Sequence, residues 1–196
     1  MDTKPDYNRL YVFAEEQAGY FTAAQAHQAG FSWERLSNSI KSGKFLRVAA
    51  GVYRLVQFPR YPHEDLFFTW LSTGPDSAIS HESALAYYEL SDVLPVEIHV
   101  IVPRTASRRR RNIRLHTHHL APDEVTTRGG LRITTVARTI ADVAAGGLAE
   151  EQLRQAIQEA LQRGLVSQDE LHTQAERRGG RAKKIIFDVL NQRANQ

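Results

Sequence analysis

One stretch decides the fold of the N-terminal part, residues 21–55, which run FTAAQAHQAGFSWERLSNSIKSGKFLRVAAGVYRL. Thr22, followed three positions later by Gln25, has the pattern of a capping box and predicts that a helix begins there. The alanines that follow are small enough for close packing against another helix. Gly30 then permits the positive φ of a sharp turn. The stretch therefore predicts a short helix and a tight turn before its second half.

Another helix is predicted directly after this turn. Ser32 has the residue type of an N-cap, and Phe31 before it is placed to pack on Leu36. Leu36 and Ile40 have helical spacing and are expected to be buried, whereas the positions between them are mostly polar. Gly43 is expected to end the helix.

A β-hairpin is predicted after this helix, with strands at residues 45–48 and 52–56 and a turn at 49–51 that contains a glycine. Before the stretch, residues 10–18 carry apolar side chains on one helical face. Three helices followed by a hairpin predict a winged helix-turn-helix, with residues 1–58 as one domain.

The exposed side of the helix after Ser32 suits DNA recognition, because the major groove admits one helix and polar side chains read base edges. Arg35 matches guanine and Asn38 matches adenine, whereas phosphate contacts are expected from Ser32, Lys41, Lys44 and Arg47. A winged helix that docks a protein, with Trp33 as its anchor, is the alternative. The candidate DNA-binding residues of this domain are Thr22, Gln25, Ser32, Trp33, Arg35, Ser37, Asn38, Ser39, Lys41, Lys44, Arg47 and Arg54.

The composition is that of a globular protein, with 42% hydrophobic and 24% charged residues in a chain of 196. No apolar run approaches the roughly 20 residues that span a bilayer, and the N-terminus lacks the apolar stretch of a secretory signal. We therefore expect a cytoplasmic protein without membrane contact. Cysteine is absent, which excludes disulfides and thiolate chemistry.

Arginine dominates the basic residues, with 20 arginines against 5 lysines, and its fork suits phosphate and guanine. A GC-rich genome would give the same bias. Six arginines fall within residues 104–114, between two predicted strands, and so are expected in a hairpin loop or at its edge. They would attract the DNA backbone, although a solvated loop remains the alternative. The candidate phosphate contacts there are Arg104, Arg108, Arg109, Arg110 and Arg111.

The remainder, residues 63–196, is predicted to be an α+β domain with a helical C-terminus, separated from the first by two prolines in residues 58–62. Residues 97–102 alternate as in a half-buried strand. Strands are expected at residues 78–79, 97–102, 113–118 and 131–134. Helices are expected at residues 63–71, 82–90, 136–145, 150–163 and 181–195. A capping box at Ser167 and Glu170 predicts the start of one more helix.

Metal and enzyme sites are not predicted. His116 and His118 would share one strand face with His119 beside them, but zinc needs three or four ligands, so histidines on a surface strand are the expected interpretation. Ser80, His81 and Glu82 are adjacent, which is poor geometry for a catalytic relay. A nuclease motif with an acidic residue and lysine in a core strand is excluded because residues 45–182 contain no lysine. We expect no catalytic residues, metal or cofactor.

Several phrases resemble the AbiEi-type antitoxins of type IV toxin-antitoxin systems. They are FTAAQA and GFS in residues 21–32, LRVAAGVYRL at 46–55, ISHESAL at 79–85, IHVIVP at 98–103 and ITTVARTIADVA at 133–144. From the first to the last they span about 120 residues, in the order expected of that family.

The resemblance implies an antitoxin that represses its own operon and counteracts a nucleotidyltransferase-like toxin without forming a stable complex with it. It also implies that residues 32–42 and the wing at 47–54 contact an inverted repeat in promoter DNA, where a homodimer is possible. No motif in the chain corresponds to the antitoxin activity itself.

Overall fold

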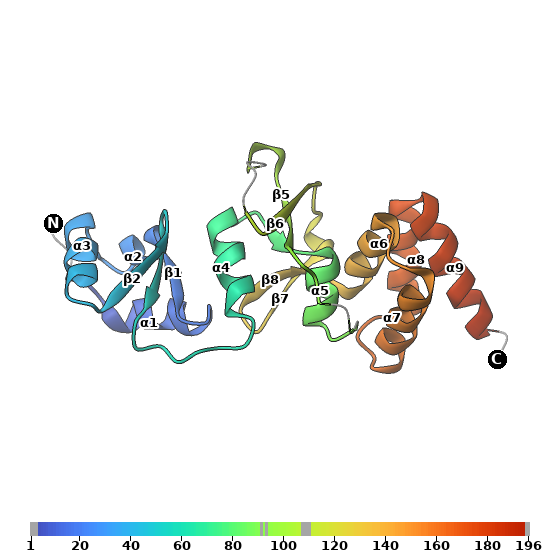
Figure 1. Ribbon diagram of the computed structural model, residues 1–196, viewed down its shortest axis with the longest axis horizontal. Helices are drawn as coiled ribbons and strands as arrows, with labels where there is room; N and C mark the ends of the chain where they lie inside the picture. Colours follow the sequence, from blue (N-terminus) through green and yellow to red (C-terminus); the bar gives the residue numbers. More distant parts are fainter. Residues whose placement is uncertain (1–3, 91, 93, 107–110, 195–196) are drawn as a thin grey trace. The chain divides into compact units, whose positions relative to one another are not determined.

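The computed structural model describes residues 4–90, 92, 94–106 and 111–194 (Figure 1). The chain divides into two compact units, residues 1–75 with 127–131 and residues 76–126 with 132–196. The expected first domain, residues 1–58, lies wholly inside the first unit, which also contains the helix after the two prolines.

The first unit contains the helices and hairpin expected from residues 1–58 and one further short strand. A sheet in the order β1-β3-β2 is antiparallel throughout, and the pairing of Phe21 with Tyr53 fixes the register of the added strand. The elements are α1 (Tyr7–Glu15), β1 (Tyr20–Thr22), α2 (Ala23–Gln28), α3 (Trp33–Lys41), β2 (Phe45–Ala49), β3 (Val52–Leu55) and α4 (Glu64–Thr73).

Local signals explain where these helices begin. The side chain of Asp6 accepts a hydrogen bond from the backbone N of Arg9, 2.9 Å away, and caps α1. The predicted capping box at Thr22 and Gln25 is present at the start of α2. Gly30 has a φ of 80°, so the turn before α3 uses the left-handed conformation expected of it. The core of these elements is formed by Leu10, Ala14, Phe21, Ala26, Ala29, Phe31, Leu36, Phe45 and Tyr53.

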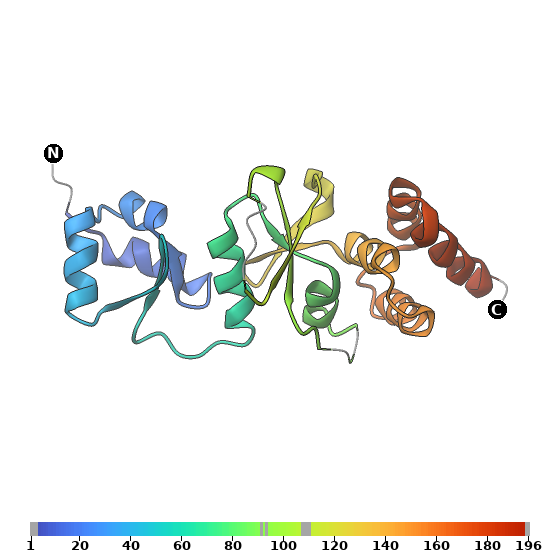
Figure 2. The same ribbon diagram turned by 45° about the horizontal axis from the view of Figure 1, so that its top comes forward.

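The second unit combines a mixed sheet with a helical C-terminal part, which confirms the α+β class (Figure 2). The sheet order is β6-β5-β4-β8-β7, with β4 antiparallel to β5, and with β4–β8 and β5–β6 parallel. The elements are β4 (Ala78–Ile79), α5 (His81–Tyr87), β5 (Ile98–Val102), β6 (Ile113–Thr117), β7 (Val125–Arg128), β8 (Leu131–Thr134), α6 (Val136–Gly146), α7 (Glu150–Gln162), α8 (Gln168–Arg178) and α9 (Gly180–Ala194), with short 3-10 turns at Arg104–Ala106 and Pro122–Glu124.

Two expectations about β5 and β6 were wrong. The sequence predicted a half-buried β5, but residues 99–102 are all buried because β5 lies between β4 and β6 and is covered on both faces. The arginine-rich segment was expected in a hairpin loop. Because β5 and β6 run parallel, these two strands do not form a hairpin.

The helices of the C-terminal part are held to one another by packing and by buried charges. Helix α6 contacts α5, α7, α8 and α9, and its residues 136–144 are all buried. Arg138 pairs with Glu124 at 2.6 Å and with Asp142 at 2.8 Å, while Arg178 of α8 lies 3.2 Å from Asp142. Every helix among the described residues is too short or too polar to cross a lipid bilayer.

Candidate nucleic-acid interface

Helix α3 has a polar face that points away from the core of the first unit. Ser32 accepts a hydrogen bond from the backbone N of Arg35 at 3.3 Å, so the helix begins where the sequence predicted. Leu36 is buried, whereas Ser37, Asn38 and Lys41 are exposed. A capped helix with exposed hydrogen-bonding side chains has the form needed to enter a DNA groove.

Trp33 is the apolar exception on this face. Its side chain is 65% exposed, and its ring meets the ring of His27 edge-on with 4.4 Å between the centroids. The contact with α2 fixes the direction of an indole that solvent still reaches. Such a residue can stack on a nucleotide or anchor a protein partner.

The β2 strand, which packs beside α3, adds positive charge. Lys44 and Arg47 are exposed, whereas Phe45 is buried in the core. The ammonium of Lys44 lies 5.5 Å from the centroid of the Tyr7 ring, which holds the start of the hairpin against α1. With Lys41 at the end of α3, these residues form a basic edge next to the polar helix face.

Two residues expected at the interface lie elsewhere. Ser39 is buried because it lies one helical turn beyond Leu36, on the core side of α3. Arg54 forms an ion pair with Glu64 of α4 at 3.3 Å and donates to the carbonyl of Pro59 at 3.1 Å. We therefore leave Ser39 and Arg54 out of the interface.

Thr22 and Gln25 hold the backbone of α2. The carboxamide oxygen of Gln25 accepts from the backbone N of Thr22 at 2.8 Å, and Thr22 Oγ1 lies 3.2 Å from the backbone N of Gln25. Gln25 also donates to the side chain of Gln17 at 3.0 Å, and both Thr22 and Gln25 are half-buried. The polar side-chain atoms of both residues are used in hydrogen bonds within the protein. Any effect of these residues on DNA binding would therefore come from how they position α2.

The arginine-rich segment lies in the second unit. Arg104 and Arg111 are exposed, as is Arg114 in β6. Arg108, Arg109 and Arg110 lie outside the described residues.

Of the three histidines expected on a surface strand, His116 lies in a different environment from the other two. His118 and His119 are exposed, but His116 is half-buried and lies next to His81 and His99. No sequence pattern predicts this grouping, because its members come from α5, β5 and β6 and meet only in the folded chain.

Two family models match the chain in sequence order. A model described as transcriptional regulator, AbiEi antitoxin, matches residues 8–56, and the model of the AbiEi antitoxin C-terminal domain matches residues 77–191. None of the curated proteins that were compared matches the chain.

Among solved structures, the crystal structure of the RV2827C protein from Mycobacterium tuberculosis has a similar fold. The TM-score is 0.55 and the sequence identity 13%, with 94% of this chain and 75% of that chain covered. At this identity the likeness shows the fold alone. The C-terminal domain model alone covers more than half of the chain, and the chain therefore belongs to the AbiEi antitoxin family.

Proposed function

We propose that the protein is a transcriptional repressor that binds double-stranded DNA through residues 1–58, with α3 as the recognition helix of a winged helix-turn-helix and the β2–β3 hairpin as its wing. The exposed polar face of α3, capped at Ser32 and bordered by Lys41, Lys44 and Arg47, is the observation that carries the proposal. Membership of a family of transcriptional regulators supports it.

The side chains have different roles in this proposal. Arg35 and Asn38 read base edges, because guanidinium matches guanine and carboxamide matches adenine in the major groove. Lys41, Lys44 and Arg47 contact phosphates and set the register of the helix on the duplex.

We further propose that the DNA is an inverted repeat in the protein's own promoter, bound by two copies in the cytoplasm, and that no catalysis is involved. Membership of an antitoxin family supports the further proposal that the protein counteracts a nucleotidyltransferase-like toxin without forming a stable complex with it. Residues 63–196 are the region that we assign to this role, with no individual residues named.

Fluorescence anisotropy with DNA from directly upstream of the gene tests the proposal. Asn38→Ala should weaken binding to the upstream duplex, whereas Asn191→Ala, which removes the same exposed side chain from α9, should bind like the wild type. If the wild-type chain does not bind its upstream DNA at low salt, the repressor proposal fails.

The exposed indole of Trp33 favours a second candidate, a protein-docking module that uses α3 as its surface. Salt dependence separates the two. DNA binding through several phosphate contacts loses orders of magnitude in affinity between low and moderate salt, whereas docking through an apolar anchor does not.

A further inference from the structure

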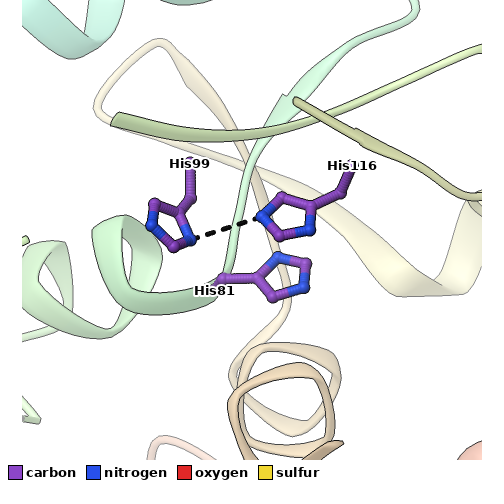
Figure 3. Close-up of side chains that lie close together, drawn as sticks. All are labelled: His81, His99 and His116. Atoms are coloured by element: carbon purple, nitrogen blue, oxygen red, sulfur yellow. Dashed lines mark hydrogen bonds between the residues drawn. The ribbon is translucent and has the colours of Figure 1, made fainter. Parts of the chain in front are cut away.

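A cluster of imidazoles lies in the second unit, outside the proposed DNA interface. His81 begins α5, His99 lies in β5 and His116 lies in β6 (Figure 3). One ring nitrogen of each residue lies within 4.8 Å of those of the other two. The three side chains thus point into one small volume, although they are far apart in the sequence.

Main-chain pairing brings these residues together. Ile101 of β5 lies opposite His116 of β6, and side chains two positions apart on a strand share a face, so His99 and His116 project from the same face. The backbone N of Ser80 donates to the carbonyl of His99 at 3.0 Å, which places the first residue of α5 beside β5. The cluster is therefore fixed by the fold and does not depend on a flexible segment.

The distances suit a shared metal ion. Nε2 of His116 lies 3.3 Å from Nδ1 of His99 (Figure 3). Two nitrogens that each bind a tetrahedral zinc ion at about 2.0–2.1 Å are about 3.3–3.4 Å apart. The rings of His81 and His116 are stacked, with 3.6 Å between centroids and an angle of 11°. Because the lone pair of an imidazole lies in the ring plane, one of these two rings has to turn about its side-chain bonds for both to reach the same ion.

A carboxylate completes the set of ligand types. Oε2 of Glu82 lies 2.6 Å from Nδ1 of His99. This oxygen is buried, and its contact with His99 holds the carboxylate at the edge of the cluster. Three imidazoles beside a carboxylate are typical zinc ligands, and they are also the donors available to a chain without cysteine.

Burial favours the neutral form of two of the clustered histidines. Burial, followed by the neighbouring His116 and His99, lowers the pKa of His81 to about 2, and burial followed by His99 lowers the pKa of His116 to about 4. Neutral rings at pH 7 can offer their lone pairs to a cation. The positive charge of Arg178 also lowers the pKa of His81. The guanidinium of Arg178 lies 3.2 Å from the buried carboxylate of Asp142, which carries the opposite charge.

The backbone at His81 supports a special role for this residue. Its φ is 50°, in the left-handed region that residues other than glycine seldom adopt. Such conformations cluster at functional sites, where the surrounding structure holds a side chain in a required direction.

We propose that His81, His99 and His116, with the carboxylate of Glu82 beside them, bind one divalent transition metal ion, with zinc as the preferred ion. The ion links β5, β6 and the start of α5, so it stabilises the second unit. The proposed metal site shares no residue with α3. If zinc does not bind there, the proposal that α3 binds DNA is unaffected.

The test uses the full-length chain, freed of any purification tag and dialysed against a chelator. Titration with zinc, followed by competition with a colorimetric chelator, should give one ion per chain and a higher Tm with zinc than without. Cobalt should bind at the same site and develop the visible absorption of a low-coordinate complex with nitrogen and oxygen ligands.

Variants locate the ion. His116→Gln, at a half-exposed position, should abolish stoichiometric zinc binding, and Glu82→Gln should weaken it by about 10–100-fold. His118→Gln and His119→Gln are the matched controls, because both residues are exposed and close in sequence, and each should bind zinc like the wild type.

The wild-type titration decides the proposal even where a variant does not fold. Absence of a stoichiometric ion in the wild type, with no change in Tm, would overturn it. So would zinc binding that survives His116→Gln in a folded chain, or that is lost with His118→Gln.

Discussion

Nε of Arg138 donates to Oδ2 of Asp142 across 2.8 Å, and both side chains are buried. The pair lies within the phrase at residues 133–144 that resembles the AbiEi-type antitoxins. Asp142 also lies 3.2 Å from Arg178, so this one carboxylate serves a guanidinium from α6 and one from α8. Two residues of the phrase therefore contribute to an ion network that joins two helices.

Asp142→Ala should destabilise the protein strongly. Removing the carboxylate breaks the buried pair with Arg138, which keeps Glu124 as a partner, and also breaks the contact with Arg178. Breaking a buried pair costs about 3–5 kcal/mol when the remaining charge has no partner, so we expect a loss near the lower end, about 3 kcal/mol. Asp123→Ala is the control, because Asp123 pairs with Arg177 at 2.7 Å where both side chains are largely exposed, and such pairs contribute about 0–1 kcal/mol. Urea unfolding measures both variants, and equal losses of stability would contradict the role given to the buried network.

Thr22→Ala tests whether this candidate residue acts through structure. Loss of the N-cap should lower the free energy of unfolding by about 0.5–2 kcal/mol, because a first-turn amide of α2 loses its acceptor. Asn38→Ala, at an exposed position of α3, should leave stability within about 0.5 kcal/mol of the wild type. A Thr22→Ala chain of unchanged stability but weakened DNA affinity would instead indicate a direct contact.

The helices could be predicted from sequence because their signals are local. Thr22 with Gln25, and Ser167 with Glu170, specify capping boxes within four residues, and both boxes are present. Strand pairing is not local. The strand at 20–22 is only three residues long and is defined by its partner β3, and the parallel pairing of β5 with β6 depends on the whole sheet.

In the candidate sites too, features with local signals could be predicted and features that depend on distant residues could not. The exposed face of α3 could be predicted from the spacing of Leu36 and Ile40, but the burial of Ser39 and the ion pair of Arg54 with Glu64 depend on neighbouring elements. The histidine cluster shows the same limit. His116 stands out in the sequence as one of a run of histidines, whereas its partners come from β5 and α5, which sequence spacing does not connect.

Arg35→Ala should relax the sequence preference at one position of the operator. Loss of bidentate hydrogen bonding to guanine costs about 1–3 kcal/mol against the preferred base and much less against the other bases. Binding to a set of duplexes that differ at single positions measures the effect. An equal reduction of affinity on every duplex would show that Arg35 contacts phosphate and reads no base.

Neutralising Arg108, Arg109, Arg110 and Arg111 together by substitution with glutamine should weaken binding to all sequences alike. If the segment binds the DNA backbone, the slope of log affinity against log salt should become shallower by about 0.9 for each phosphate that an arginine no longer neutralises. The same titration on the wild type is the reference. An unchanged slope would mean that this segment does not touch DNA.

Whether α3 reads the protein's own promoter can be measured by a salt titration of binding to upstream and scrambled duplexes of equal length. We expect a steep decrease of affinity with salt on both duplexes and tighter binding to the upstream sequence. The difference between the two duplexes should be reduced by Arg35→Ala and Asn38→Ala but not by Lys184→Ala. Equal affinity of the wild type for both duplexes, or a preference that both α3 variants keep, would contradict the proposal that α3 reads this promoter.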